Sequence, residues 1–150
     1  MGTPHTSCTG LKAIWDCDRR AKAKWENLVS EQQRISRCLC GAVELKLVGE
    51  PIIMGLCHCE SCTRWLSAPV HASALWSSDN VEVTKGEEFL RTFKRTPETG
   101  SHRKFCSECG SGVLIDHPTV NFTDIPAVSV VDLEFETHAH TLFAQGNFYP

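Results

Sequence analysis

The sequence predicts a mainly β fold, in the form of a small sandwich or folded-over sheet. Three observations carry this prediction. Short segments alternate polar and apolar residues, turn residues separate them, and seven of the nine cysteines fall in groups spaced like metal ligands. From residue 35 onward the chain does not alternate strand and helix in the way that α/β folds require.

The strands are expected where apolar residues recur at every second position. Val43, Leu45 and Leu47 alternate with polar residues, which is typical of a half-buried strand. The sequence Lys85-Gly86-Glu87 reads as a turn between two short strands. The expected strands are residues 43–47, 52–56, 70–76, 81–84, 89–93 and 113–115, with further candidates at 127–131 and 141–144.

The first 34 residues differ from the rest of the chain. Trp15 and Trp25 lie in polar sequence with apolar residues at roughly helical spacing, which predicts one or two short helices. A loosely attached leader is the alternative. We therefore divide the chain into a partly helical N-terminal extension, 1–34, and a metal-binding domain, 35–150.

Size, charge and hydrophobicity indicate a single domain and argue against binding to nucleic acid or insertion into a membrane. The 150 residues suit one domain with a modest core, and a net charge of -3 gives no general attraction to nucleic acid. No apolar run approaches the ~20 residues that span a bilayer. Residues 1–12 lack the apolar centre of a signal peptide. We expect a cytoplasmic protein with no membrane or nucleic-acid partner, and the sequence leaves a homo-oligomer open.

Two cysteine pairs are followed by glycine, as in a metal-binding turn. They are Cys38–Gly41 and Cys106–Gly110. Glycine at this place lets the backbone turn beneath the sulfur with positive φ. Four thiolates form the closed tetrahedral set of a structural zinc, whereas the alternative is two plain turns with buried thiols. The expected ligands are Cys38, Cys40, Cys106 and Cys109.

A third group has three cysteines within six residues, in the pattern C-H-C-x-x-C. Three protein ligands with an open fourth position are typical of a catalytic zinc. His58, between two of the cysteines, is expected to point away from the ion if the segment is extended. The alternative is a second structural site completed by His71, His102 or Cys17. The expected ligands and catalytic residues are Cys57, Cys59 and Cys62.

Basic residues near the cysteine groups are candidates for binding an anionic substrate. Arg64 follows the triad, and His102, Arg103 and Lys104 precede the second turn. Arg64 and Arg103 are the expected substrate- or cofactor-binding residues, although each also suits a solvated surface. Asp116 and His117 are weaker acid or base candidates, and Cys8 and Cys17 are expected to be free thiols.

The order of these motifs resembles the glutathione-dependent formaldehyde-activating enzyme family, which includes centromere protein V. The matching stretches are Cys38–Val43, Cys57–Cys62 with Arg64, and Arg103–Ser111. The resemblance covers residues 38 to about 144. It implies the Mss4-like fold, a compact arrangement of β-sheets around zinc. It also implies a structural zinc at the four-cysteine group and a glutathione-linked zinc at the triad.

Two functions follow from these expectations. The first is a carbon–sulfur lyase-like enzyme that adds glutathione or another thiol to formaldehyde or a small carbonyl compound. Three thiolates make zinc a weak Lewis acid, which favours thiol binding over water activation. The second is a non-catalytic zinc-stabilised binding module, as centromere protein V suggests for part of the family.

Overall fold

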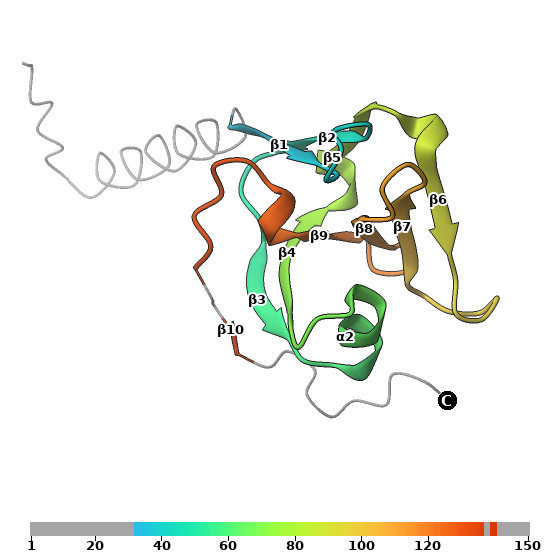
Figure 1. Cartoon of the computed structure of the whole chain (residues 1–150). Helices are drawn as coiled ribbons and strands as arrows, with labels where there is room; N and C mark the ends of the chain where they lie inside the picture. Colours follow the sequence, from blue (N-terminus) through green and yellow to red (C-terminus); the bar gives the residue numbers. More distant parts are fainter. Residues whose placement is uncertain (1–31, 137–138, 141–150) are drawn as a thin grey trace, which may run out of the picture.

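Two β-sheets make up the part of the chain that is described in the computed structural model, residues 32–136 and 139–140 (Figure 1). The strands are β1 (Gln33–Arg37), β2 (Glu44–Val48), β3 (Ile53–Cys57), β4 (His71–Ser77), β5 (Val81–Lys85), β6 (Leu90–Phe93), β7 (His102–Cys106), β8 (Gly112–His117), β9 (Phe122–Pro126) and β10 (Ala139–His140). One α-helix, α2 (Glu60–Leu66), lies between β3 and β4, and three 3-10 turns are η1 (Ser78–Asn80), η2 (Glu87–Phe89) and η3 (Ala127–Ser129).

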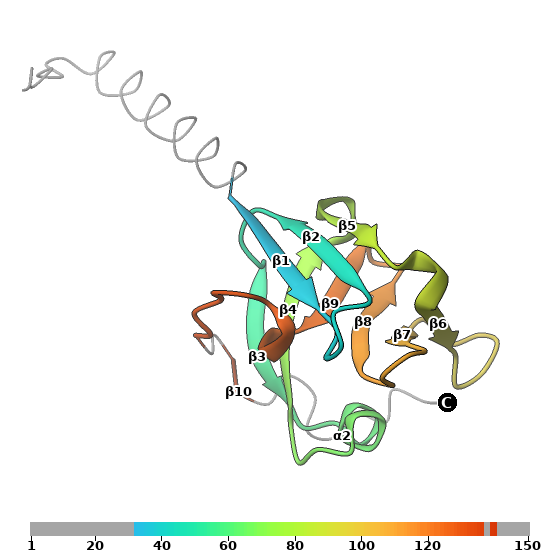
Figure 2. The same ribbon diagram turned by 45° about the horizontal axis from the view of Figure 1, so that its top comes forward.

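The sheets differ in size. The smaller one has the strand order β1-β2-β5, and the larger one has the order β10-β3-β4-β9-β8-β7-β6. All neighbouring strands are antiparallel except β10 and β3, which are parallel. Figure 2 shows β1 and β2 crossing over the strands of the larger sheet. This arrangement is the sandwich-like, mainly β fold that the sequence predicts.

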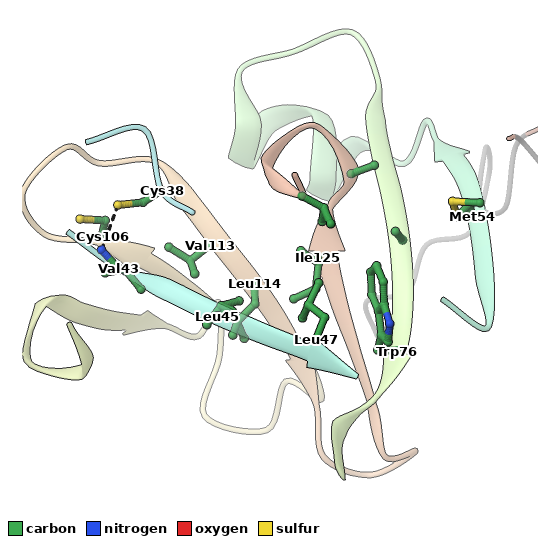
Figure 3. Packing of buried hydrophobic residues seen from close by; sticks show 13 residues of the cluster. Cys38, Val43, Leu45, Leu47, Met54, Trp76, Cys106, Val113, Leu114 and Ile125 are labelled. Carbon is green, nitrogen blue, oxygen red and sulfur yellow. Dashed lines mark hydrogen bonds between the residues drawn. The ribbon is translucent and has the colours of Figure 1, made fainter. Parts of the chain in front are cut away.

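The hydrophobic core lies between the two sheets. Leu45 and Leu47 of β2 are fully buried against the larger sheet, where Trp76 and Ile125 are also fully buried. Figure 3 shows Cys38 and Cys106 at one end of this core and Trp76 toward the other. Burial of each large apolar side chain contributes about 1.5–3 kcal/mol, so β2 is a main source of adhesion between the sheets.

The opposite face of the larger sheet carries the helix. Along β4, His71 and Ser73 alternate with Ala74 and Trp76 of the core, and therefore point to the other side. Asp124 and Ile115 belong to the same side as His71, because Leu75 pairs with Asp124 and Asp124 pairs with Ile115. We call this surface the α2 face, because residues of α2 and His71 line one common cavity on it.

Most of the expected strands are confirmed. The strands β2, β3, β4, β5, β6 and β8 overlap the segments that the alternation predicts. Strands β1, β7, β9 and β10 and helix α2 are additional elements. Residues 1–31 of the N-terminal extension and the strand expected at 141–144 lie outside the described residues, so the division at residue 34 remains a prediction.

The strand expected at 127–131 is wrong. Residues Ala127–Ser129 form the 3-10 turn η3, and only Val130 makes an isolated bridge, to Ser36. Ser129 Oγ donates to the Pro126 carbonyl at 2.7 Å, which closes the turn. Val128 is 90% exposed, so the apolar residues of this segment do not share the buried face that a strand would give them.

Helices that could cross a membrane are not found among the described residues, since none is both long and apolar enough.

Candidate metal centres

The four-cysteine group brings together two turns from different sheets. Cys38 and Cys40 lie between β1 and β2, whereas Cys106 ends β7 and Cys109 lies in the turn before β8. Their sulfur atoms all lie within 4.8 Å of one another. The Cys38–Cys40 and Cys40–Cys106 sulfur separations are 3.6 and 3.9 Å. Four thiolates at about 2.3 Å from a tetrahedral ion would be about 3.8 Å apart, so the group fits such an ion.

The two turns use the same local geometry. Gly41 and Gly110 have φ values of +71° and +75°, and their N–H groups donate to the Cys38 and Cys106 carbonyls at 3.0 and 2.8 Å. Ser111 joins the turns, because its Oγ accepts from the Leu39 N–H at 3.1 Å and lies 3.1 Å from Cys109 Sγ. The glycines therefore have the positive φ that the sequence predicts, and the two half-sites are held together.

The thiols of this group have divergent acidities. Hydrogen bonds from the hydroxyl and the backbone of Ser111 lower the pKa of Cys109 to about 6. For Cys40, a hydrogen bond from the Ala42 backbone lowers the pKa, but burial and the neighbouring sulfurs outweigh it and raise the pKa to about 12. Crowded sulfurs thus compete for protons in the metal-free protein, and an ion would replace those protons.

The triad is placed by the end of a strand and the start of a helix. Cys57 ends β3, Cys59 is the N-cap of α2, and Cys62 lies in its first turn. Helix α2 follows β3 in the chain (Figure 1). The Cys59 sulfur accepts a hydrogen bond from the Cys62 N–H at 3.4 Å, so it takes the place of the usual capping oxygen. All three sulfurs lie within 4.8 Å of one another, which allows one ion to contact each of them.

Acidities in the triad diverge in the same way. A hydrogen bond from Cys62 lowers the pKa of Cys57 to about 5, despite its burial. The same contact, followed by burial, raises the pKa of Cys62 far above its ordinary value. Within this group, the contact between the two sulfurs therefore favours the thiolate form of Cys57 and the thiol form of Cys62.

The structure brings no fourth ligand to the triad among the residues it describes. Neither His71 nor His102 has a ring nitrogen within 4.8 Å of all three sulfurs, and exposed His58 does not join the group either. Cys17, the third candidate, lies outside the described residues. Among the described residues, the triad is thus a group of three thiols, whereas the other group has four.

Helix α2 is held on the sheet by aromatic contacts. The Trp65 ring stacks on Phe93 with a centroid separation of 5.4 Å and meets the Phe105 ring edge-on at 5.9 Å. A cavity of about 10 Å³, room for about one water molecule, is lined by Trp65 and Leu66 of α2 and by residues of the strands beneath. Gly112 lies below these side chains, and a β-carbon there would be 3.4 Å from Leu66.

The two candidate arginines lie in contrasting places. Arg64 is 80% exposed, and its Nε lies 3.3 Å from Glu60 one turn earlier in α2. Arg103 is only 4% exposed and donates through Nη2 to Ser61 Oγ, between two triad cysteines. The Nε of Arg103 is buried and has no hydrogen-bond partner in the described part of the chain. Arg103 therefore brings a buried positive charge to α2.

A polar cluster on the α2 face was not anticipated from the sequence. His71 Nε2 lies 3.0 Å from Asp124 Oδ2, and Ser73 Oγ donates to Asp124 Oδ1 at 2.7 Å. Burial alone would lower the pKa of His71, but the bond and charge of Asp124, with a smaller contribution from Cys57, raise it. The i, i+2 spacing of His71 and Ser73 was the available signal, but nothing linked it to a carboxylate some fifty residues away.

The two acid–base candidates near the end of β8 do not join the triad. Asp116 pairs with His102 across β7 and β8. His117 Nδ1 lies 3.3 Å from Ser101 Oγ, and burial lowers the pKa of its ring.

Comparison with known proteins adds a family and a fold. Residues 33–143 match the family described as glutathione-dependent formaldehyde-activating enzyme. A Schizosaccharomyces pombe protein described as an uncharacterized lyase is 31% identical over 74 residues, which are 49% of this chain and 50% of the relative. The match thus spans about half the length of that curated relative. A solved Rhodobacter sphaeroides structure has a TM-score of 0.53 and 21% identity, covers 67% of this chain and 90% of its own, and supports the fold alone.

Proposed function

The chain belongs to the glutathione-dependent formaldehyde-activating enzyme family, and on this basis we propose that it is a zinc-dependent carbon–sulfur lyase-like enzyme. The proposed reaction is reversible addition of a thiol, such as that of glutathione, to formaldehyde or another small carbonyl compound. The sulfur forms a bond to the carbonyl carbon, and the proton of the thiol ends on the carbonyl oxygen. The lyase description of the yeast relative supports the class of reaction, not the substrate.

One observation carries this proposal: the three triad sulfurs converge, and no described side chain completes the set. A complete four-cysteine group in the same chain provides the contrast. If both groups hold zinc, the first has no position for a substrate, whereas the triad has one.

The triad suits a thiol substrate on electrostatic grounds. Zinc bound there would keep a substrate thiol deprotonated near neutral pH and so make it a nucleophile. Cys57, Cys59 and Cys62 would hold the ion, and three thiolates with one divalent cation carry a net charge of about −1. The buried charge of Arg103, hydrogen-bonded to Ser61 between those cysteines, offsets this negative charge.

We assign the two arginines different roles in binding. Arg64 is exposed on the helix that carries Cys62, so the carboxylate of an arriving substrate can reach it by displacing Glu60. Arg103 is buried, and its contribution is to orient α2 and supply charge beneath the triad. The cytoplasmic location expected from the sequence belongs to this proposal, because free thiols and glutathione require a reducing compartment.

The second candidate is a non-catalytic zinc-stabilised binding module. The small size of the cavity beside α2, about 10 Å³, favours this alternative, because a peptide-sized thiol does not fit inside it. Under the first proposal, the substrate must instead approach the triad from the solvent side of α2, where Arg64 lies.

The test is an adduct-formation assay. Zinc-loaded protein is mixed with formaldehyde and glutathione, and the adduct is followed by NMR against the uncatalysed rate. We expect acceleration by the wild-type protein, and none by Cys62→Ser, which removes one triad sulfur but leaves the four-cysteine group intact. A wild-type rate equal to the uncatalysed one, together with no binding of glutathione, would rule out the enzyme and leave the binding module.

A further inference from the structure

The buried cluster of His71, Ser73 and Asp124 takes no direct part in the proposed reaction. These side chains are 2%, 3% and 7% exposed, as deeply buried as the hydrophobic core. Both oxygens of the Asp124 carboxylate have a partner, Oδ2 in His71 at 3.0 Å and Oδ1 in Ser73 at 2.7 Å. Burial of a carboxylate is costly unless it is paired in this way. The pairing also fixes the orientation of the imidazole ring.

The cluster lies directly beside the triad. In the antiparallel pairing of β3 and β4, Cys57 is opposite His71. Side chains directly opposite each other in such a pair lie on the same face, with their β-carbons about 4.5–5.5 Å apart. Cys57 is itself only 6% exposed. The imidazole therefore lies between the Asp124 carboxylate and the buried sulfur of the triad.

Position separates this cluster from the structural core. Ala74 and Trp76 of β4 face the smaller sheet, whereas His71 and Ser73 alternate with them and face α2. His71 is also not a member of the triad, since its ring nitrogens do not lie within 4.8 Å of all three sulfurs. In many metal sites, polar groups outside the ligand set hold the ligands in position. A histidine fixed by a carboxylate, next to a ligand but outside the ligand set, is placed to act in this way.

We propose that Asp124 and His71 form a positioning pair for Cys57, which holds its sulfur in the ligand position of the triad, with Ser73 fixing the carboxylate. This inference rests on the proposed metal binding by the triad. The pair contacts neither substrate nor ion; it acts through Cys57. Loss of the carboxylate frees the imidazole ring to turn, and the Cys57 sulfur then has a less ordered neighbour.

The experiment compares three variants of the full zinc-loaded chain. Asp124→Asn keeps the size of the side chain and removes its charge, and Ser73→Ala removes one hydrogen bond of the carboxylate. Ser36→Ala is the matched control, because Ser36 is 1% exposed and its Oγ lies 2.8 Å from Ser129 Oγ, at a position away from the α2 face. Zinc release to a chromogenic chelator and thermal unfolding are measured for each.

We expect two ions to leave the wild-type protein at different rates. Asp124→Asn should weaken binding of the triad ion by about 10–100-fold, the usual effect of a change in the residues that surround the ligands of a metal site. Release from the four-cysteine group should not change. Ser73→Ala should also weaken binding of the triad ion, but by a smaller factor. Ser36→Ala should lower the unfolding temperature without changing the release of either ion. If Asp124→Asn does not fold, Ser73→Ala decides the question.

The remaining outcomes separate this inference from the proposed function. If the wild-type protein accelerates adduct formation and the variants retain the triad ion normally, the positioning pair is wrong and the enzyme stands. If the variants lose the triad ion faster but the wild-type protein is inactive, the pair stands and the enzyme is wrong. A wild-type protein with no triad ion overturns both.

Discussion

Cys62 and Cys109 each follow another cysteine by three residues, yet they belong to groups of different size. Cys109 is one of four sulfurs drawn from two turns in different sheets. Cys62 is one of three sulfurs from a single stretch of chain that joins β3 to α2. The same local spacing therefore has different consequences, because only the four-cysteine group links distant parts of the molecule.

Replacement of either cysteine by serine should separate these roles. Binding of a structural zinc contributes about 10–16 kcal/mol, which is as large as the whole stability of most domains. We expect Cys109→Ser to unfold the domain at 25 °C, whereas Cys62→Ser should stay folded and lose only the triad ion. Circular dichroism during thermal unfolding, with metal content per chain, measures both effects. Similar losses of stability in the two variants would contradict the division.

At the scale of the element, α2 is the part of the site that depends most on its neighbours. A helix of seven residues is too short to be stable alone. None of its residues is fully buried, so the contacts of Trp65 with Phe93 and Phe105, and of Arg103 with Ser61, must hold it on the sheet. The position of Cys62 therefore depends on an aromatic contact outside the metal group.

Removal of the Trp65 ring should loosen α2. Trp65→Ala leaves Phe93 and Phe105 without a partner, at a cost of about 3 kcal/mol, the lower end for loss of a large aromatic side chain. We expect faster release of the triad ion and greater hydrogen exchange in residues 60–66, whereas Trp65→Phe should retain much of both properties. Unchanged exchange in this helix after Trp65→Ala would show that other contacts position Cys62.

The burial pattern and the length of each element explain whether the sequence could predict it. Alternation of Val43, Leu45 and Leu47 predicts β2, because one face of that strand is buried and the other is open. In β7, however, the buried residues are Arg103 and Cys106, which are three positions apart. Strand β9 buries Asp124 and ends at a proline, so neither strand shows apolar alternation. Helix α2 has only seven residues, which is too short for a helical periodicity to be recognised in the sequence.

At the scale of the whole molecule, the four-cysteine group joins the two sheets at one end of their common core. Cys40, in the turn between β1 and β2 of the smaller sheet, and Cys106, at the end of β7 in the larger sheet, are 66 residues apart, with sulfurs 3.9 Å apart. Closing so long a loop costs chain entropy, which bound metal can offset. The hydrophobic residues between the sheets and the proposed ion therefore act together on one interface.

In the candidate site, the sequence predicts the cysteine groups but not the buried polar residues around them. Both cysteine groups follow from spacing, because ligands of one turn are close in sequence and glycine marks the turn. The pairing of His71 with Asp124 does not follow from spacing, because the two residues lie on different strands and are 53 residues apart in the chain. The burial of Arg103 was equally hidden, since an arginine beside a lysine reads as surface.

The central claim is that one chain holds a complete four-thiolate centre and an open three-thiolate centre. Cadmium-113 NMR of the protein with cadmium in place of zinc tests this most directly, because each bound ion gives its own resonance. We predict two resonances. The first comes from the ion at the four-cysteine group and does not change when glutathione is added. The second comes from the ion at the triad, and its chemical shift moves toward that of the first when glutathione is added. A single resonance, or two resonances that are both insensitive to glutathione, would contradict the claim.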